Sequence, residues 1–372
     1  MNQVTYKITL RPVEAFYFGG EGSFTSKLPS GIVSTDENAK KYFKPRQEYF
    51  AKSEMFPQQT QLLGMLRKEL LRIEGKLFYF KNFVAIPHSD QNEAKALIGD
   101  RRWSPEEKLS LGEIDAMGPL FLQHREKLYI GAPFDDELKL VATGKGYING
   151  RPTQAYAFEK RCDPDHYFGA KDYPCSDLVA KDRSRLKPDE LFEAFVQTQT
   201  QTLAYKEDDE EQLFKVHKYR FKDKDTAFVF FVTMKKKIEM LNGLQTTVEL
   251  GGERSAFTMS VEEANEPDVQ RDFVFLQTDQ PRIVLLSDAK VDSSIFECCK
   301  VTFSQKRIFR HIRDKKSFAK SGKIVMLAKG TVFYPKSNKI EEIKKKIDKA
   351  TNFQTIGYNR YLDLTQGEKN EH

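Results

Sequence analysis

Short runs of apolar residues predict a protein built largely from strands. Residues 6–13 alternate polar and apolar side chains, and strand-like runs return at 195–203, 214–221 and 227–234. The runs at 195–203 and 214–221 flank the acidic stretch KEDDEE, which is typical of a long hairpin. The run at 227–234 is apolar on both faces, so it indicates a central strand.

Two segments show the period of an amphipathic helix. After Pro57, leucines recur on one helical face at positions 62, 63, 66 and 70. Gly64 lies inside this helix at a cost of about 1 kcal/mol relative to Ala, which indicates either close approach of another backbone or simple tolerance. A second helix is predicted over 339–349, where isoleucines share one face.

The order of these elements predicts an α+β fold with helices packed on antiparallel sheets, and a ferredoxin-like or RRM-like plan fits it. We expect an N-terminal domain over 1–265 and a C-terminal domain over 266–372. Residues from about 135 to 195 are rich in Gly, Pro, Asp and Lys and lack periodicity. They are predicted to form an irregular insertion with short elements.

Composition alone does not identify a ligand. The 372 residues include 60 Lys and Arg against 54 Asp and Glu, and the net charge of +6 matters less than its distribution. The four cysteines show no disulfide framework, and the N-terminus shows no export signal. The apolar runs are far shorter than the roughly 20 residues that span a bilayer. We therefore expect a cytoplasmic protein without membrane contact.

Two glycine-rich segments are candidate ligand surfaces. The segment FYFGGEGSF, with Phe18, Gly19 and Gly20, follows the first strand and is expected to form an open loop. The second segment is LGGERS, over 250–255. It matches neither the P-loop spacing nor the dinucleotide-binding fingerprint.

The LGGERS segment has the residues that a phosphate-binding loop needs. Gly251 and Gly252 allow a backbone to approach a phosphate closely, and Arg254 and Ser255 supply hydrogen-bond donors. A paired glycine is nevertheless more often an ordinary turn. Binding of an RNA backbone therefore needs support from elsewhere in the chain.

That support comes from a basic segment near residue 310. Cations alternate there with Phe303 and Phe309, a pattern in which cations meet phosphates and rings stack on bases. The cations are Lys306, Arg307, Arg310, His311 and Arg313. A solvated face over buried phenylalanines is an equally good interpretation.

No catalytic or metal site is predicted. None of the six histidines falls in a recognisable catalytic motif. Cys162, His166 and Cys175 have a nonstandard zinc spacing and lack a clear fourth ligand. We therefore expect no cofactor, no metal and no enzymatic activity.

Several motifs together resemble one known family. FPQQTQLLGMLRKELL, the 195–221 hairpin, LGGERS, LAKGTVFYP and FQTIGYN follow one another in the order seen in subunit three of the type III-B CRISPR (Cmr) effector complex, a member of the RAMP superfamily. The first motif resembles the family's Pro-x-x-(Thr/Ser)-x-x-Gly-x-Leu-Arg helix, matched by residues that include Thr60 and Arg67. The glycine of the family's "G-x-LF" strand is replaced in the acidic KEDDEEQ, so the hairpin geometry departs from the pattern.

The resemblance implies a pair of modified ferredoxin-like folds and a role without catalysis. Such a subunit would hold the 5′ repeat-derived handle of the crRNA and cap the foot of a hetero-oligomeric complex. It would dock the large polymerase-like subunit and the first backbone subunit. The hairpin around 199–206 would act as a thumb that wedges between bases, with Gln199, Thr200, Gln201 and Thr202 as contacts.

Three alternatives remain open. A repeat-processing endoribonuclease of the same superfamily could use His217, Lys218 or Tyr219. A pure protein-interaction subunit would make no RNA contact, and the type III-A counterpart would share the fold and position.

Overall fold

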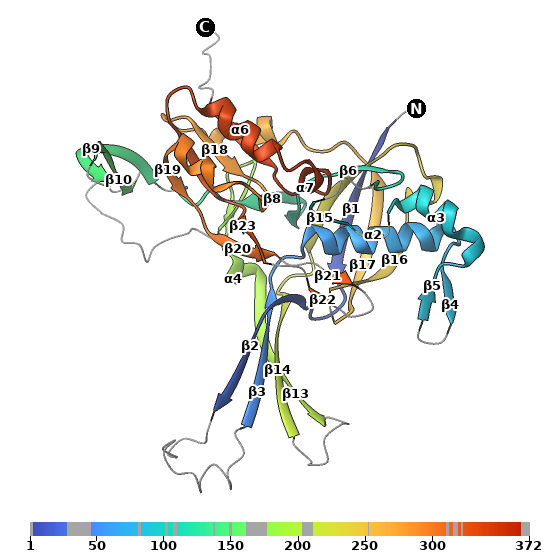
Figure 1. Ribbon diagram of the computed structural model, residues 1–372. Coiled ribbons are helices and arrows are strands. Elements are labelled where there is room, and N and C mark those ends of the chain that lie inside the picture. Colours follow the sequence, from blue (N-terminus) through green and yellow to red (C-terminus); the bar gives the residue numbers. More distant parts are fainter. Residues whose placement is uncertain are drawn as a thin grey trace, which may run out of the picture.

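The computed structural model describes residues 3–27, 46–80, 83–100, 103–106, 110–136, 138–148, 151–160, 177–202, 211–251, 253–309, 312–314, 319–320 and 323–365. At some positions inside these strands only the backbone is described. Figure 1 shows a body of sheets and helices from which a long four-stranded thumb projects.

A nine-stranded antiparallel sheet forms the centre of the body. Along the sheet the order is β12 (Arg185–Leu186), β11 (Leu178–Ala180), β8 (Lys127–Gly131), β7 (Phe121–His124), β15 (Thr226–Met234), β1 (Val4–Pro12), β17 (Ser255–Glu263) and β16 (Gln245–Leu250), with β6 (Ile114–Met117) also paired to β15. The central position of β15 confirms the prediction from its two apolar faces.

Each face of this sheet packs against a different layer. On one face Ile8 and Phe230 share a core with leucines of α2 (Gln59–Ile73), and α3 (Gln91–Ile98) packs beside that helix. On the other face Val229 and Phe231 share a core with Val284 and Val332 of a second sheet. Both faces of β15 are therefore buried, which explains why its side chains are apolar on both faces.

The second sheet is C-terminal and antiparallel. Its order is β19 (Cys299–Phe303), β24 (Val332–Pro335), β18 (Arg282–Leu285) and β25 (Tyr361–Leu364). Its outer face packs on α6 (Ile340–Asp348), whose Ile343 and Ile347 are fully buried. This confirms the predicted helix and gives the body a helix, sheet, sheet, helix order.

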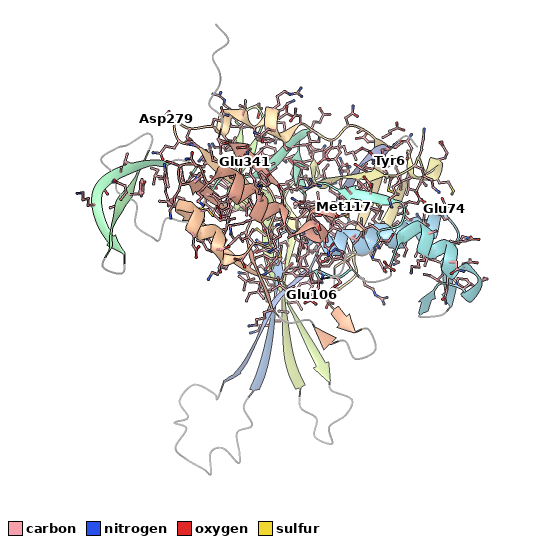
Figure 2. All side chains as sticks on the ribbon, turned by 45° about the horizontal axis from the view of Figure 1, so that its top comes forward. Tyr6, Glu74, Glu106, Met117, Asp279 and Glu341 are labelled. Atoms are coloured by element: carbon pink, nitrogen blue, oxygen red, sulfur yellow. The ribbon has the colours of Figure 1, made fainter. Side chains whose placement is uncertain are left out.

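The thumb consists of two hairpins rather than one. β13 (Phe192–Thr202) and β14 (Glu211–Phe221) form the predicted hairpin, and β2 (Phe18–Lys27) and β3 (Arg46–Glu54) form a second. Parallel pairing of β3 with β14 joins them into one sheet. In the turned view of Figure 2 the thumb still projects from the body, in which the labelled Tyr6 and Met117 lie.

The expected open loop at 18–20 is therefore wrong, because this segment is a strand. Gly19 pairs with Ser53, and the register shifts between Gly19 and Gly22, so the glycines accommodate a bulge. The insertion also contains more regular structure than its composition indicated. β9 (Leu138–Ile148) and β10 (Arg151–Lys160) form a long ribbon that projects at the left of Figure 1.

The remaining elements are short. Three two-stranded ribbons pair β4 (Phe78–Phe80) with β5 (Phe83–Ala85), β20 (Lys306–Phe309) with β23 (Ile324–Leu327), and β21 (Ile312–Asp314) with β22 (Ala319–Lys320). The short helices are α4 (Pro188–Leu191), α5 (Val269–Asp272) and α7 (Thr351–Thr355), with 3-10 turns at His88–Asp90, Glu239–Leu241, Val274–Leu276 and Ser293–Cys298. The fold is thus α+β with antiparallel sheets, as predicted.

Candidate nucleic-acid interface

The LGGERS loop packs against the strand that enters the thumb. A Cβ on Gly251 would lie 2.3 Å from the carbonyl oxygen of Tyr17, and Gly251 has a φ of +87°. Ser255 is buried, and its Oγ accepts a hydrogen bond from the backbone N–H of Tyr17 at 3.0 Å. Gly251 and Ser255 are therefore occupied in anchoring the loop to the base of the thumb.

Arg254 is the part of this loop that faces solvent. Its side chain is exposed, its φ is +52°, and its guanidinium forms no ion pair or hydrogen bond with a residue that the structure describes. Gly252 lies outside the described residues. The loop therefore presents one unpaired guanidinium at the thumb base on an anchored backbone.

Phe18 does not reach solvent. It is fully buried, its ring stacks on Phe257 with centroids 5.8 Å apart, and its N–H donates to the Oγ of Ser53 at 2.9 Å. The core covers the ring of Phe18 in the isolated chain, so the ring offers no stacking surface there, and an RNA contact of Phe18 stays a prediction. Gly19 and Gly20 contribute strand backbone next to it.

The two candidates on α2 differ in exposure. Thr60 is half-buried in the first turn, only a few residues after the thumb strand β3 ends. Arg67 is 6% exposed, and its Nε and Nη2 have no hydrogen-bond partner. Burial lowers its pKa to about 10, partly offset by the nearby carboxylate of Asp100. In the isolated chain this burial leaves little of Arg67 accessible, and its contact with RNA stays a prediction.

The basic segment is split between surface and core. On β20, Lys306 is exposed, while Arg307 lies 3.8 Å from Glu54 of the thumb and 3.6 Å from Asp288. Phe309 is buried in a cluster with the rings of Trp103, Phe353 and Tyr358, so it cannot stack on a base. Arg310 and His311 lie outside the described residues.

The predicted thumb contacts lie far out on the projecting hairpin (Figure 1). The backbones of Gln199, Thr200, Gln201 and Thr202 pair with residues 211–214 of β14. The loop between the two strands, residues 203–210, lies outside the described residues.

Lys329 was not found from the sequence. Its Nζ lies 3.1 Å from the centroid of the Phe56 ring. Phe56 belongs to the segment that joins β3 to α2. Burial, and then the positive charge of Arg307, lower its pKa to about 7. Lys329 lies in a tightly packed turn, because a Cβ on the neighbouring Gly330 would lie 2.8 Å from the carbonyl oxygen of Ala132. A lysine beside a glycine gives no sequence signal for such burial.

The residues of the endoribonuclease alternative are only partly brought together. The rings of His217 and Tyr219 lie edge to face with centroids 4.8 Å apart, on one face of β14. Lys218 points to the opposite face, because side chains alternate along a strand. Two of the three groups could therefore meet one substrate.

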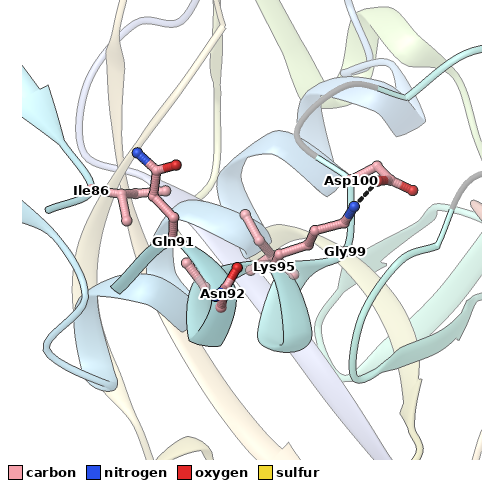
Figure 3. A pocket seen from close by; sticks show the side chains of 8 residues that line it. Ile86, Gln91, Asn92, Lys95, Gly99 and Asp100 are labelled. Carbon is pink, nitrogen blue, oxygen red and sulfur yellow. Dashed lines mark ion pairs between the residues drawn. The ribbon is translucent and has the colours of Figure 1, made fainter. Parts of the chain in front are cut away.

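The described residues hold no cluster of three or more metal-ligating side chains. Cys162, His166 and Cys175 lie outside the described residues. A hollow of about 270 Å³ on α3 is lined by residues that include Gln91, Asn92, Lys95 and Asp100. Figure 3 shows that its charged groups form one ion pair, Lys95 to Asp100 at 3.3 Å. None of the predicted site residues lines it.

Within the described part of the chain, no helix is both long and apolar enough to cross a membrane.

Comparisons with known proteins agree with the fold and the motifs. The model of the family described as CRISPR-associated protein (Cas_Cmr3) matches residues 175–365. None of the curated proteins compared with the chain matches it. A chain in a cryo-EM structure of type III-B Cmr-beta bound to cognate target RNA and AMPPnP is 13% identical, with a TM-score of 0.50 and 97% of each chain covered. A second such structure, with cognate target RNA, gives 12% identity, a TM-score of 0.47 and the same coverage.

The family match spans the thumb hairpin, LGGERS and both late glycine-bearing motifs, which are four of the five segments that carried the resemblance, while FPQQTQLLGMLRKELL lies outside the matched residues. The chain belongs to the family of CRISPR-associated proteins described as Cas_Cmr3.

Proposed function

We propose that the chain binds the 5′ repeat-derived handle of the crRNA, without catalysing a reaction, within the type III-B effector complex. It would cap the foot of that complex beside the large polymerase-like subunit and the first backbone subunit. The observation that carries the proposal is Arg254, an exposed cation whose guanidinium pairs with none of the described residues, on a loop fixed to the base of the thumb.

The physical chemistry of single-stranded RNA supports this location. Such a strand is held by cations and backbone donors along its phosphates and by surfaces inserted between its bases. Arg254 and Lys306 offer exposed cations, and the hairpin through Gln199 and Thr202 offers an edge that can separate bases. Gly251, Ser255 and Phe18 support these groups from within the protein.

The test compares handle RNA with scrambled RNA of equal length across a salt series, using native chain and Arg254→Ala. We expect Arg254→Ala to weaken handle binding about tenfold, because a charge-assisted contact is lost. The dependence of log affinity on log salt should fall by about 0.7, the value for one phosphate contact on a single strand.

Arg125→Ala is the matched control. Arg125 is also an exposed arginine with positive φ, but it lies on the β7–β8 turn. Equal losses in both variants would indicate nonspecific attraction to the net charge. Absence of RNA binding by the native chain, alone and with its partner subunits, would favour the pure interaction subunit.

The endoribonuclease alternative makes a separate prediction. We expect repeat RNA to remain intact with the pure chain, with or without divalent metal. Cleavage that disappears in His217→Ala would overturn the proposal that the chain does not catalyse a reaction.

A further inference from the structure

We propose that one face of the thumb sheet, formed by Lys52, Ala194, Val196, His217 and Tyr219, binds a nucleotide of single-stranded RNA. The base would pack against the rings of His217 and Tyr219, and Lys52 would hold a neighbouring phosphate. We call this surface the front face. The inference rests on the proposed function and adds a binding surface apart from the LGGERS loop.

The strand register places these residues together. His217 on β14 is paired with Val196 on β13 and with Lys52 on β3, so the three form one row across the sheet. Tyr219 lies two residues further along β14 and is paired with Ala194. Since paired residues, and residues two apart, share a face, all five side chains point to the same side.

The two rings are only partly covered by the protein. They contact each other edge to face, and both remain partly exposed. On the neighbouring strand β13, Phe192 packs edge to face on Tyr219, while beside His217 the strand presents the exposed Ala194 and the branched Val196, which is 52% exposed. A flat aromatic ligand can therefore approach the rings from the side of β13, as bases do on aromatic residues of other single-strand-binding sheets.

The polar groups of the rings suit an uncharged base. Burial, and then the charge of Lys52, lower the pKa of His217, so the imidazole is neutral at pH 7. Its Nδ1 is buried without a hydrogen-bond partner. Burial, and then the charge of Glu54, raise the pKa of Tyr219, so its hydroxyl stays protonated and can donate.

The charges of the front face favour an anion near its middle. Lys52 is exposed and pairs with no carboxylate among the described residues. Glu54, two residues further along the strand, lies 3.8 Å from Arg307, so its charge is partly balanced. A phosphate beside Lys52 therefore meets an unpaired cation next to the rings.

The reverse face of the same strands lacks these properties. Val216 and Ala51 are 2% and 3% exposed, so this level of the sheet is covered on that side. Arg220 is paired with Glu193 at 2.8 Å. Lys218, next to His217 in sequence, projects to the reverse face and provides a charge-matched control.

The experiment measures binding of the full chain to handle RNA and to an unrelated single strand of equal length, for native protein, Lys52→Ala, His217→Ala and Lys218→Ala. We expect Lys52→Ala and His217→Ala each to weaken binding about tenfold, the latter because a stacked base is lost. Only Lys52→Ala should reduce the salt dependence, by about 0.7. Lys218→Ala should bind within about twofold of native protein, because Lys218 lies on the reverse face and makes no contact with the proposed phosphate.

The outcomes separate this inference from the proposed function. If Arg254→Ala weakens binding while Lys52→Ala and His217→Ala bind as native, the front face is excluded and handle binding stands. Equal effects of Lys52→Ala and Lys218→Ala would also overturn the inference. If Lys52→Ala impairs association with the other subunits but leaves RNA affinity unchanged, the face docks protein and the inference is wrong. If native chain binds no RNA, both proposals fail.

Discussion

Lys329 shows how tertiary contacts alter one side chain. Its amine lies over the Phe56 ring, and burial and Arg307 lower its pKa to about 7 from an ordinary value of 10.5. The unfolded chain therefore binds more protons than the folded chain between these two pH values. Linkage then requires the free energy of unfolding to rise with pH across this window.

We expect Lys329→Met to lose this dependence, because methionine does not titrate. Measured by urea unfolding, the stability of the variant relative to native chain should be greatest below pH 7 and should decline as pH rises toward 10.5. A difference that stays constant from pH 6 to pH 10 would show that the amine is not perturbed in the folded state.

Arg67 shows the same effect of tertiary contacts at the candidate nucleic-acid interface. Its place after Gly64 in a family-like motif predicted a surface contact, yet the guanidinium is buried and partly unpartnered. Residue type and motif identified Arg254 and Lys306 as exposed cations, but they could not separate these from Arg67. Exposure depends on what packs over a side chain, and that is set by distant segments.

At the scale of an element, helix α2 contains a glycine that lowers the stability of the helix. Gly64 is exposed in the middle of the helix, and a Cβ there would meet nothing within 4 Å. Of the two interpretations of Gly64, the isolated chain therefore supports tolerance. We expect Gly64→Ala to stabilise the chain by about 1 kcal/mol in denaturant unfolding, because alanine restricts the unfolded backbone and favours helix.

Gly357→Ala provides the contrast. Gly357 has a φ of +92°, and its Cβ would lie 2.2 Å from the carbonyl oxygen of Gly118, so this change should destabilise. A destabilising effect of Gly64→Ala would mean that the helix has a neighbour among the residues beyond those described.

For the whole molecule, the two proposed domains share their interiors. The core that contains Ile8 and α2 also contains Phe309 and Phe353, and the core between the sheets joins Val229 to Val284. A buried ion pair links Arg282 to Asp135 at 2.5 Å, and Tyr334 donates to the same carboxylate. We still propose that the chain divides into two units near residue 265. This division describes the order of elements along the chain and does not imply that either unit is stable by itself.

We therefore expect one cooperative unfolding transition. The single tryptophan, Trp103, packs on Phe353, so its fluorescence reports on the junction, while circular dichroism reports on all strands. The two probes should give the same midpoint. Asp135→Ala should lower both midpoints together and reduce the free energy of unfolding by about 3–5 kcal/mol, because it leaves Arg282 buried without its partner. Separate midpoints would indicate domains that unfold independently.

The sequence by itself determined the elements with strong local periodicity. The 3.6-residue period of leucines gave α2, the two apolar faces of β15 gave a central strand, and the acidic turn gave the β13–β14 hairpin. The order of short motifs gave the family. These signals are local, because each depends on residues within one element or one turn.

Only the tertiary structure decided how these elements meet. The parallel pairing of β3 with β14 joins the predicted hairpin to a second one in a four-stranded thumb. Antiparallel pairing with β3 makes the glycine-rich segment at 18–27 a strand, β2. The parallel pairing also gathers Lys52, His217 and Val196 on one face. Pairing between strands far apart in the chain leaves no periodic signal in either one, because it is chosen by the packing of the whole molecule.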